Sequence, residues 1–285
     1  MIPAYTLLGT EDAPHLVWML HGVLGAGNNL KSLASKLCER KPGLRIALLD
    51  LRAHGRSSGA SGPHTLEACV DDLIELSRDL GRCPRTVIGH SLGGKVALAY
   101  GLRHENPAGR FLPADPSALA QVWTLDSDPG AQQAGDDHQV KKVLAALLRQ
   151  QGPFAARKDA VDALRSEGLS LSLANWLATS LKRCPEGYAW RFELEAIGEL
   201  LEDYFSVDYW GQLEAIAADE TAARPRYDLL VAENSDRWSG SMQDRATSLR
   251  GGARLDVHLL RDAGHWVHVD NPEGLLTILD EHLLD

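Results

Sequence analysis

The sequence predicts an α/β fold in which a mostly parallel, doubly wound sheet is interrupted by an inserted helical segment. Short apolar runs alternate with amphipathic stretches of helical length over residues 1–129 and again over 219–285. Between these two parts, residues 130–218 show helical patterns throughout. Because neighbouring parallel strands need a crossover connection, usually a helix, the alternation favours a parallel sheet with helices on both faces.

The first part of the chain contains four expected strands and three expected helices. The strands are short apolar runs bounded by loop residues, at 16–20, 44–49, 85–89 and 122–125. The helices have apolar residues three or four positions apart, as on one face of a helix, and cover 28–40, 65–80 and 91–103. Thr65 is a plausible N-cap, because its hydroxyl can accept a hydrogen bond from a free amide of the first turn.

The middle segment and the end of the chain complete the pattern. The helices expected in the middle segment cover 140–150, 158–167, 172–181 and 194–204. Strands at 227–232 and 254–260 follow, with a helix near 243–250 between them; Asn271 as cap and Pro272 as first helical residue open the closing helix. We therefore expect a core of residues 1–129 and 219–285, and a helical cap of residues 130–218 that lies over the carboxyl ends of the strands as a lid.

Charge and composition argue against several function classes. Lys and Arg number 29 against 39 Asp and Glu, so the formal net charge is −10 and the surface repels nucleic acid and anionic lipid. No apolar run reaches the roughly 18 residues that span a bilayer, and the N-terminus lacks the pattern of a secretory signal. We expect a soluble intracellular protein, cytoplasmic or organellar after removal of a transit peptide. Its cysteines lack metal-ligand spacing, so we expect reduced thiols and no metal: Cys38, Cys69, Cys83 and Cys184.

The strongest chemical signal is the G-x-S-x-G pattern Gly89-His90-Ser91-Leu92-Gly93 between an expected strand and an expected helix. A sharp strand-to-helix turn needs small residues two positions before and after the nucleophile, where the chain crowds itself. The pattern also places Ser91 at a helix N-terminus, where the helix dipole favours developing negative charge. It predicts that Ser91 is a nucleophile; the alternative is a structural serine in a glycine-rich turn.

A second signal is His21-Gly22-Val23-Leu24-Gly25, directly after the first expected strand. Acyl transfer needs backbone N–H donors aimed at the developing oxyanion. The amides of Val23 and Leu92 are the predicted donors. The alternative is an ordinary loop between a strand and a helix.

A general base and its acid partner complete the expected site. His265, just after the last expected strand, comes last in the order serine, acid, histidine, and it is the predicted base; the alternative is a structural loop histidine. Two carboxylates fit as its partner: Asp126 ends the strand at 122–125, and Asp236 follows the strand at 227–232. Either strand end can present a carboxylate to the far imidazole nitrogen. Asp128 is a weaker option, because Asp128-Pro129 is typical of a turn.

On these motifs the chain resembles the α/β-hydrolase superfamily and, more narrowly, the small bacterial serine esterases and their mitochondrial and plant relatives. The motifs lie at 21–25, 50–57, 89–95 and 263–268 and span almost the whole core in the right order. Plant-type members look closest, through Leu125-Asp126 and Asp270-Asn271-Pro272. In that subgroup the acid lies after the strand that precedes the cap, which implies Asp126; in the wider superfamily it lies at the position that matches Asp236. We predict Asp126.

The motifs and the resemblance together predict a serine hydrolase that cleaves a small-molecule carboxylic ester or thioester through an acyl-Ser91 intermediate, with no cofactor. A serine at this position argues against dehalogenases and epoxide hydrolases, which by resemblance use a carboxylate there. Two alternatives stay open. One is a carbon–carbon bond hydrolase or a cofactor-free perhydrolase on the same three residues, and the other is a non-catalytic ligand-binding protein on a hydrolase core.

Overall fold

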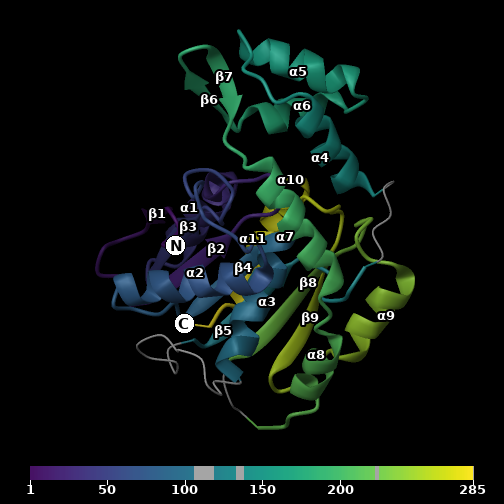
Figure 1. Ribbon diagram of the computed structural model, residues 1–285. Coiled ribbons are helices and arrows are strands. Elements are labelled where there is room, and N and C mark those ends of the chain that lie inside the picture. Colours follow the sequence, from purple (N-terminus) through teal and green to yellow (C-terminus); the bar gives the residue numbers. More distant parts are fainter. Residues whose placement is uncertain (106–118, 133–137, 222–224, 285) are drawn as a thin grey trace.

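The computed structural model describes residues 1–105, 119–132, 138–221 and 225–284. At its centre lies a seven-stranded sheet of order β1-β3-β2-β4-β5-β8-β9 (Figure 1). Neighbouring strands are parallel except for β1 and β3, which pair antiparallel. The strands are β1 (Tyr5–Leu8), β2 (His15–Leu20), β3 (Leu44–Leu49), β4 (Thr86–His90), β5 (Gln121–Leu125), β8 (Arg226–Ala232) and β9 (Leu255–Leu260).

Helices cover both faces of the sheet, so the α/β, doubly wound prediction is confirmed. On one face α1 (Lys31–Arg40) packs beside α11 (Pro272–His282), and on the other α2 (Leu66–Asp79) packs beside α3 (Leu92–Glu105). Strand β2 contributes to both apolar clusters: Trp18 faces the cluster with α2 and α3, and Met19 faces the cluster with α1 and α11. A strand buried on both sides has an unbroken apolar sequence, as in residues 16–20.

The predicted helix starts are confirmed at two capping residues. The side chain of Thr65 accepts a hydrogen bond from the Ala68 amide at 3.1 Å, and that of Asn271 accepts one from the Gly274 amide at 2.9 Å. Two further helices, α9 (Gly240–Ser248) and α10 (Val267–Asp270), flank β9 in the chain. The expected helix over 28–40 begins with a 3-10 turn at Gly27–Leu30 before α1. Among the described residues, no helix combines the length and apolar character needed to cross a membrane.

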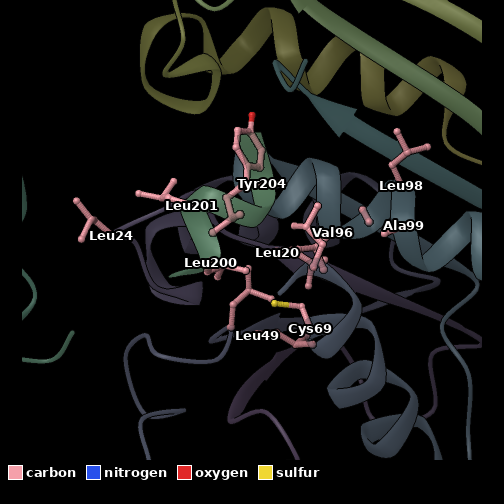
Figure 2. Close-up of a cluster of buried hydrophobic side chains, with 14 of the residues drawn as sticks. Leu20, Leu24, Leu49, Cys69, Val96, Leu98, Ala99, Leu200, Leu201 and Tyr204 are labelled. Carbon is pink, nitrogen blue, oxygen red and sulfur yellow. The ribbon is translucent and has the colours of Figure 1, made fainter. Parts of the chain in front are cut away.

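Among the described residues, seven further elements lie in the chain between β5 and β8. Helices α4, α5 and α6 and a two-stranded hairpin stand together at one end of the molecule, while α7 runs back along the core (Figure 1). Figure 2 shows Leu200, Leu201 and Tyr204 of α7 in one apolar cluster with Val96 of α3. The elements are α4 (Gln139–Arg149), α5 (Arg157–Ser166), α6 (Leu171–Ala178), β6 (Leu181–Cys184), β7 (Gly187–Trp190), α7 (Leu194–Ser206) and α8 (Trp210–Ala217).

Lys95 of the core contacts two parts of the chain between β5 and β8, namely its start at Gly130 and helix α7. The side chain is fully buried in α3, and its Nζ donates to the backbone oxygens of Gly130 at 2.7 Å and Tyr204 at 2.8 Å. The ammonium also lies over the Tyr204 ring, 4.6 Å from its centroid. A buried cation with two carbonyl acceptors fixes the start of the inserted segment and α7 to the helix that follows Ser91.

The prediction that residues 130–218 are helical throughout is wrong at the hairpin. Strands β6 and β7 pair antiparallel from Leu181↔Trp190 to Cys184↔Gly187, so the helix expected over 172–181 ends at Ala178. Phe154 and Tyr188 exchange backbone hydrogen bonds along the edge of the hairpin. Strands of four residues are too short for a period of two to stand out in the sequence. Strand β1 was missed for the same reason.

Candidate active site

The predicted site residues meet at the carboxyl edge of the central sheet. Ser91 directly follows β4, Asp126 directly follows β5, and His265 lies five residues after the end of β9. Parallel strands bring their carboxyl ends to the same edge, and ligand sites of open α/β sheets lie there. Residues that are up to 174 positions apart in the chain are therefore in direct contact.

The turn that carries Ser91 has the geometry that its glycines allow. Ser91 has a φ of +53°, in the left-handed region, and its amide donates to the Leu125 oxygen at 3.1 Å. A Cβ on Gly89 would lie 2.0 Å from the Gly93 oxygen, and one on Gly93 would lie 2.5 Å from the Leu20 oxygen. Larger residues therefore do not fit at either position, and the turn holds Ser91 at the N-terminus of α3.

Ser91, His265 and Asp126 form one hydrogen-bonded line. His265 Nε2 lies 3.1 Å from Ser91 Oγ, and His265 Nδ1 lies 2.7 Å from Asp126 Oδ2. The buried Asp126 carboxylate also accepts from the Ala232 amide at 3.0 Å and from the Ser235 hydroxyl at 2.6 Å. An ionised carboxylate only accepts, so Nδ1 carries the proton and Nε2 is free to take the one on Ser91.

None of the other candidate carboxylates contacts His265 among the described interactions. The Asp236 side chain is 66% exposed, and its nearest cation is Arg237, 3.1 Å away. Asp128 accepts from the Gly130 amide and the Gln132 side chain, which is the turn role expected for it. Of the two acids that the sequence left open, the geometry favours Asp126.

The loop after β2 is braced by two histidines. His54 Nε2 accepts from the Leu24 amide at 3.0 Å, and His21 Nε2 accepts from the Leu51 amide at 3.0 Å, so each loop holds the other. Burial and the neighbouring His21 lower the pKa of His54 to about 3, which keeps its ring neutral and able to accept. The braced loop carries Val23, which lines the same cavity as Leu92 and Ser91.

Two further histidines surround His265 without taking its position. His90 Nε2 donates to the His265 backbone oxygen at 2.7 Å, and burial lowers the pKa of His90. His268 lines the cavity, and burial together with the nearby His265 lowers its pKa to about 4. Both rings are therefore neutral near pH 7. His90 holds the His265 backbone, and His268 forms part of the cavity wall.

A cavity of about 430 Å³ opens beside Ser91 and His265. Its size suits a small organic molecule. The inserted segment supplies an apolar wall from α4, α6 and α7, made by Val140, Val143, Leu173, Trp176, Leu201 and Phe205. Within the described part of the chain, no group of three or more His, Cys, Asp and Glu side chains is placed to hold a metal ion.

Sequence reasoning missed two residues of this site, Ser235 and Arg237. Ser235 donates to Asp126, and Arg237 lines the cavity. Their position shortly after β8 places them near the carboxyl edge of the sheet. Nothing in their residue types, however, indicates which side chain of that loop turns toward the acid.

The chain is similar in sequence to known hydrolases. The sequence model of the alpha/beta hydrolase family matches residues 15–278. The sn-1-specific diacylglycerol lipase ABHD11 of Xenopus tropicalis is 30% identical over 273 residues, which cover 94% of this chain and 77% of that protein. Esterase YbfF of Escherichia coli is 25% identical over 273 residues, or 94% of this chain and 92% of that protein.

Solved structures show the same architecture. A marine microorganism esterase superposes with a TM-score of 0.77 at 23% identity over 99% of both chains, and E-2-(acetamidomethylene)succinate hydrolase does so with 0.72 at 18% identity, over 98% of this chain and 94% of its own. The chain belongs to the alpha/beta hydrolase family and is one of its carboxylic-ester hydrolases.

Proposed function

We propose that this protein hydrolyses small-molecule carboxylic esters or thioesters through an acyl intermediate on Ser91. The observation that carries the proposal is the line from Ser91 Oγ through His265 to Asp126, at 3.1 Å and 2.7 Å, on the wall of a cavity. Relatives that are lipases and esterases support the same chemistry.

The first half of the reaction acylates the serine. His265 Nε2 takes the Ser91 proton while Oγ attacks the carbonyl carbon of the substrate. The carbonyl oxygen becomes an oxyanion, held by the amides of Val23 and Leu92. As the tetrahedral intermediate collapses, His265 gives its proton to the leaving alcohol or thiol, and the acyl group stays on Ser91.

The second half returns the free enzyme. His265 takes a proton from water, and the resulting hydroxide attacks the acyl carbon. The ester bond to Ser91 then breaks, the carboxylic acid leaves, and Oγ recovers its proton from His265. Asp126 stays ionised throughout, and its contact with Nδ1 stabilises the imidazolium in both halves.

Residues 130–218 act in this proposal as the substrate cap over a core of residues 1–129 and 219–285. The apolar side chains of α4, α6 and α7 in the cavity wall support this division, because they supply an apolar surface for the acyl or alcohol chain. The contacts of Lys95 with Gly130 and Tyr204 support a fixed position for the base of the cap.

Labelling with a fluorophosphonate probe tests the nucleophile. We expect the probe on the peptide that contains Ser91, and neither labelling nor ester turnover in Ser91→Ala. Ser166→Ala, which changes an exposed serine of α5, is the matched control and should label like the wild type. Full activity or labelling in Ser91→Ala would rule out the acyl-Ser91 mechanism.

A further inference from the structure

Among the described residues that line the substrate cavity, Arg237 is the one Lys or Arg side chain. Its side chain is 22% exposed, and its Nη2 donates to Gln139 Oε1 at 2.9 Å. Its Nε is buried and makes no hydrogen bond, because the neighbouring Asp236 carboxylate, 3.1 Å away and 66% exposed, is not aligned to accept. Among the described residues, the guanidinium thus has one hydrogen bond, to a neutral group, and one ion pair, with an exposed carboxylate.

The Arg237 guanidinium has more N–H donors than the described acceptors around it use. It offers five N–H groups, and a largely buried charge is stable when acceptors pair with them. Gln139 uses its oxygen for Arg237, so its own amide N–H groups remain as donors beside the guanidinium. A carboxylate or phosphate is the chemical group that accepts from both at once.

The position of Arg237 is tied to the reacting atoms. The Arg237 amide donates to Ser235 Oγ at 3.1 Å, and that hydroxyl donates to Asp126 at 2.6 Å. The one carboxylate among the described lining residues, Asp270, accepts from the Gly264 amide at 2.9 Å. Although the whole chain carries a net charge of −10, the described cavity lining therefore includes one guanidinium, on a residue whose backbone amide is linked to Asp126 through Ser235.

We infer that Arg237 and Gln139 form an anion-binding subsite, and that the ester substrate carries a second, negatively charged group, a carboxylate or a phosphate. This inference rests on the proposed function, since it assigns a substrate class to the same cavity. Arg237 is a specificity-determining residue in this view, and it takes no part in proton transfer.

Matched ester pairs test the inference. Monoethyl glutarate and ethyl valerate differ in a carboxylate on the acyl side, and butyrylglycerol 3-phosphate and monobutyrin differ in a phosphate on the alcohol side. The readout is the ratio of kcat/KM for the charged ester to kcat/KM for its neutral partner, followed by pH-stat titration. We expect Arg237→Met to lower this ratio about 10- to 100-fold for one pair, the range of a charge-assisted hydrogen bond, and the pair that responds identifies the anion.

Three further variants serve as controls for this test. Arg250→Met changes the net charge equally at an exposed arginine outside the cavity and should keep the wild-type ratio. Arg237→Lys keeps the charge without the planar fork and should give an intermediate ratio. Gln139→Leu removes the second donor at an exposed position and should lower the ratio even if Arg237→Met folds poorly. Wild-type ratios for both pairs in Arg237→Met and Gln139→Leu would overturn the inference.

Binding separates the subsite from the catalytic proposal. Ser91→Ala protein is titrated calorimetrically with monoethyl glutarate and with butyrylglycerol 3-phosphate, alone and combined with Arg237→Met. Binding that needs Arg237 supports the subsite whether or not Ser91 is the nucleophile. If neither compound binds more weakly once Arg237 is replaced, the subsite does not exist, even where ester turnover proceeds.

Discussion

Replacing Asp126 by Asn tests the assignment of the acid most directly, because the hydrogen bonds around this carboxylate fix how the new amide would sit. One side of the carboxylate accepts from the Ala232 amide at 3.0 Å, and the other faces His265 Nδ1 at 2.7 Å and the Ser235 hydroxyl at 2.6 Å. With the amide oxygen toward Ala232, the amide nitrogen faces His265. In the reverse orientation two N–H donors meet at about 3 Å while both are buried, which costs about 1–3 kcal/mol for each unsatisfied group.

The favoured orientation reverses the tautomer of His265. An N–H donor facing Nδ1 requires Nδ1 to accept, so the ring proton moves to Nε2, 3.1 Å from Ser91 Oγ. A protonated Nε2 cannot take the hydroxyl proton. The same substitution in a serine protease triad lowers kcat about 10⁴-fold, or about 5 kcal/mol in the activation barrier, and we expect a loss of that size here.

Steady-state hydrolysis of p-nitrophenyl butyrate measures the effect, with thermal unfolding to verify the fold. Asp236→Asn is the matched control: its side chain is 66% exposed and touches no residue of the line, so we expect kcat within about twofold of the wild type. A 10⁴-fold loss in Asp236→Asn with a near-normal Asp126→Asn would refute both the acid assignment and the tautomer argument.

Further substitutions test the support of the site and the packing of the core. His54→Leu removes the acceptor of the Leu24 amide, so the loop that carries the Val23 donor loses a contact. We expect kcat to fall about 10- to 100-fold with a smaller change in KM, and His54→Gln to retain more activity. Stopped assays on both variants measure this. Burial lowers the pKa of Lys95 to about 8 from 10.5, so the unfolded chain holds a proton that the folded chain loses between pH 8 and 10.5. The Tm of the wild type should therefore rise relative to that of Lys95→Met across this window, and a constant difference would contradict it. Leu279→Ala, in the fully buried face of α11, should lower the free energy of unfolding in urea by about 2–5 kcal/mol.

The sequence predicted those parts of the site that depend on local chain geometry. The small residues around Ser91 are required by the turn itself, since a Cβ on Gly89 would overlap the Gly93 oxygen. The order of Ser91 and His265 in a parallel sheet brings both to one edge. Strand β2 was predicted for a similar local reason: it is an apolar run buried on both faces, as its alternating contacts show.

What depends on contacts between distant segments could not be predicted in this way. Phe154 pairs with Tyr188 of β7, although the two residues are far apart in the sequence. The reciprocal contacts of His21 and His54 join two loops whose separate sequences give no sign of the pairing. Both contacts join segments that only the folded chain brings together, and the sequence of one segment alone does not show which other segment will lie beside it.

The choice between Asp126 and Asp236 is the clearest example of a feature that depends on contacts between distant segments. Asp126 and Asp236 both follow strands, so strand position alone supports either. The structure puts Asp126 directly at the end of β5 with a φ of +47°, which turns its side chain toward His265. The neighbouring end of β8 then supplies donors to that carboxylate, from Ala232 and Ser235, in place of a carboxylate of its own. Arg237 follows in the same loop, and among the described residues Gln139 is the one hydrogen-bond partner of its guanidinium in the cavity lining. This is the arrangement from which we infer an anionic substrate.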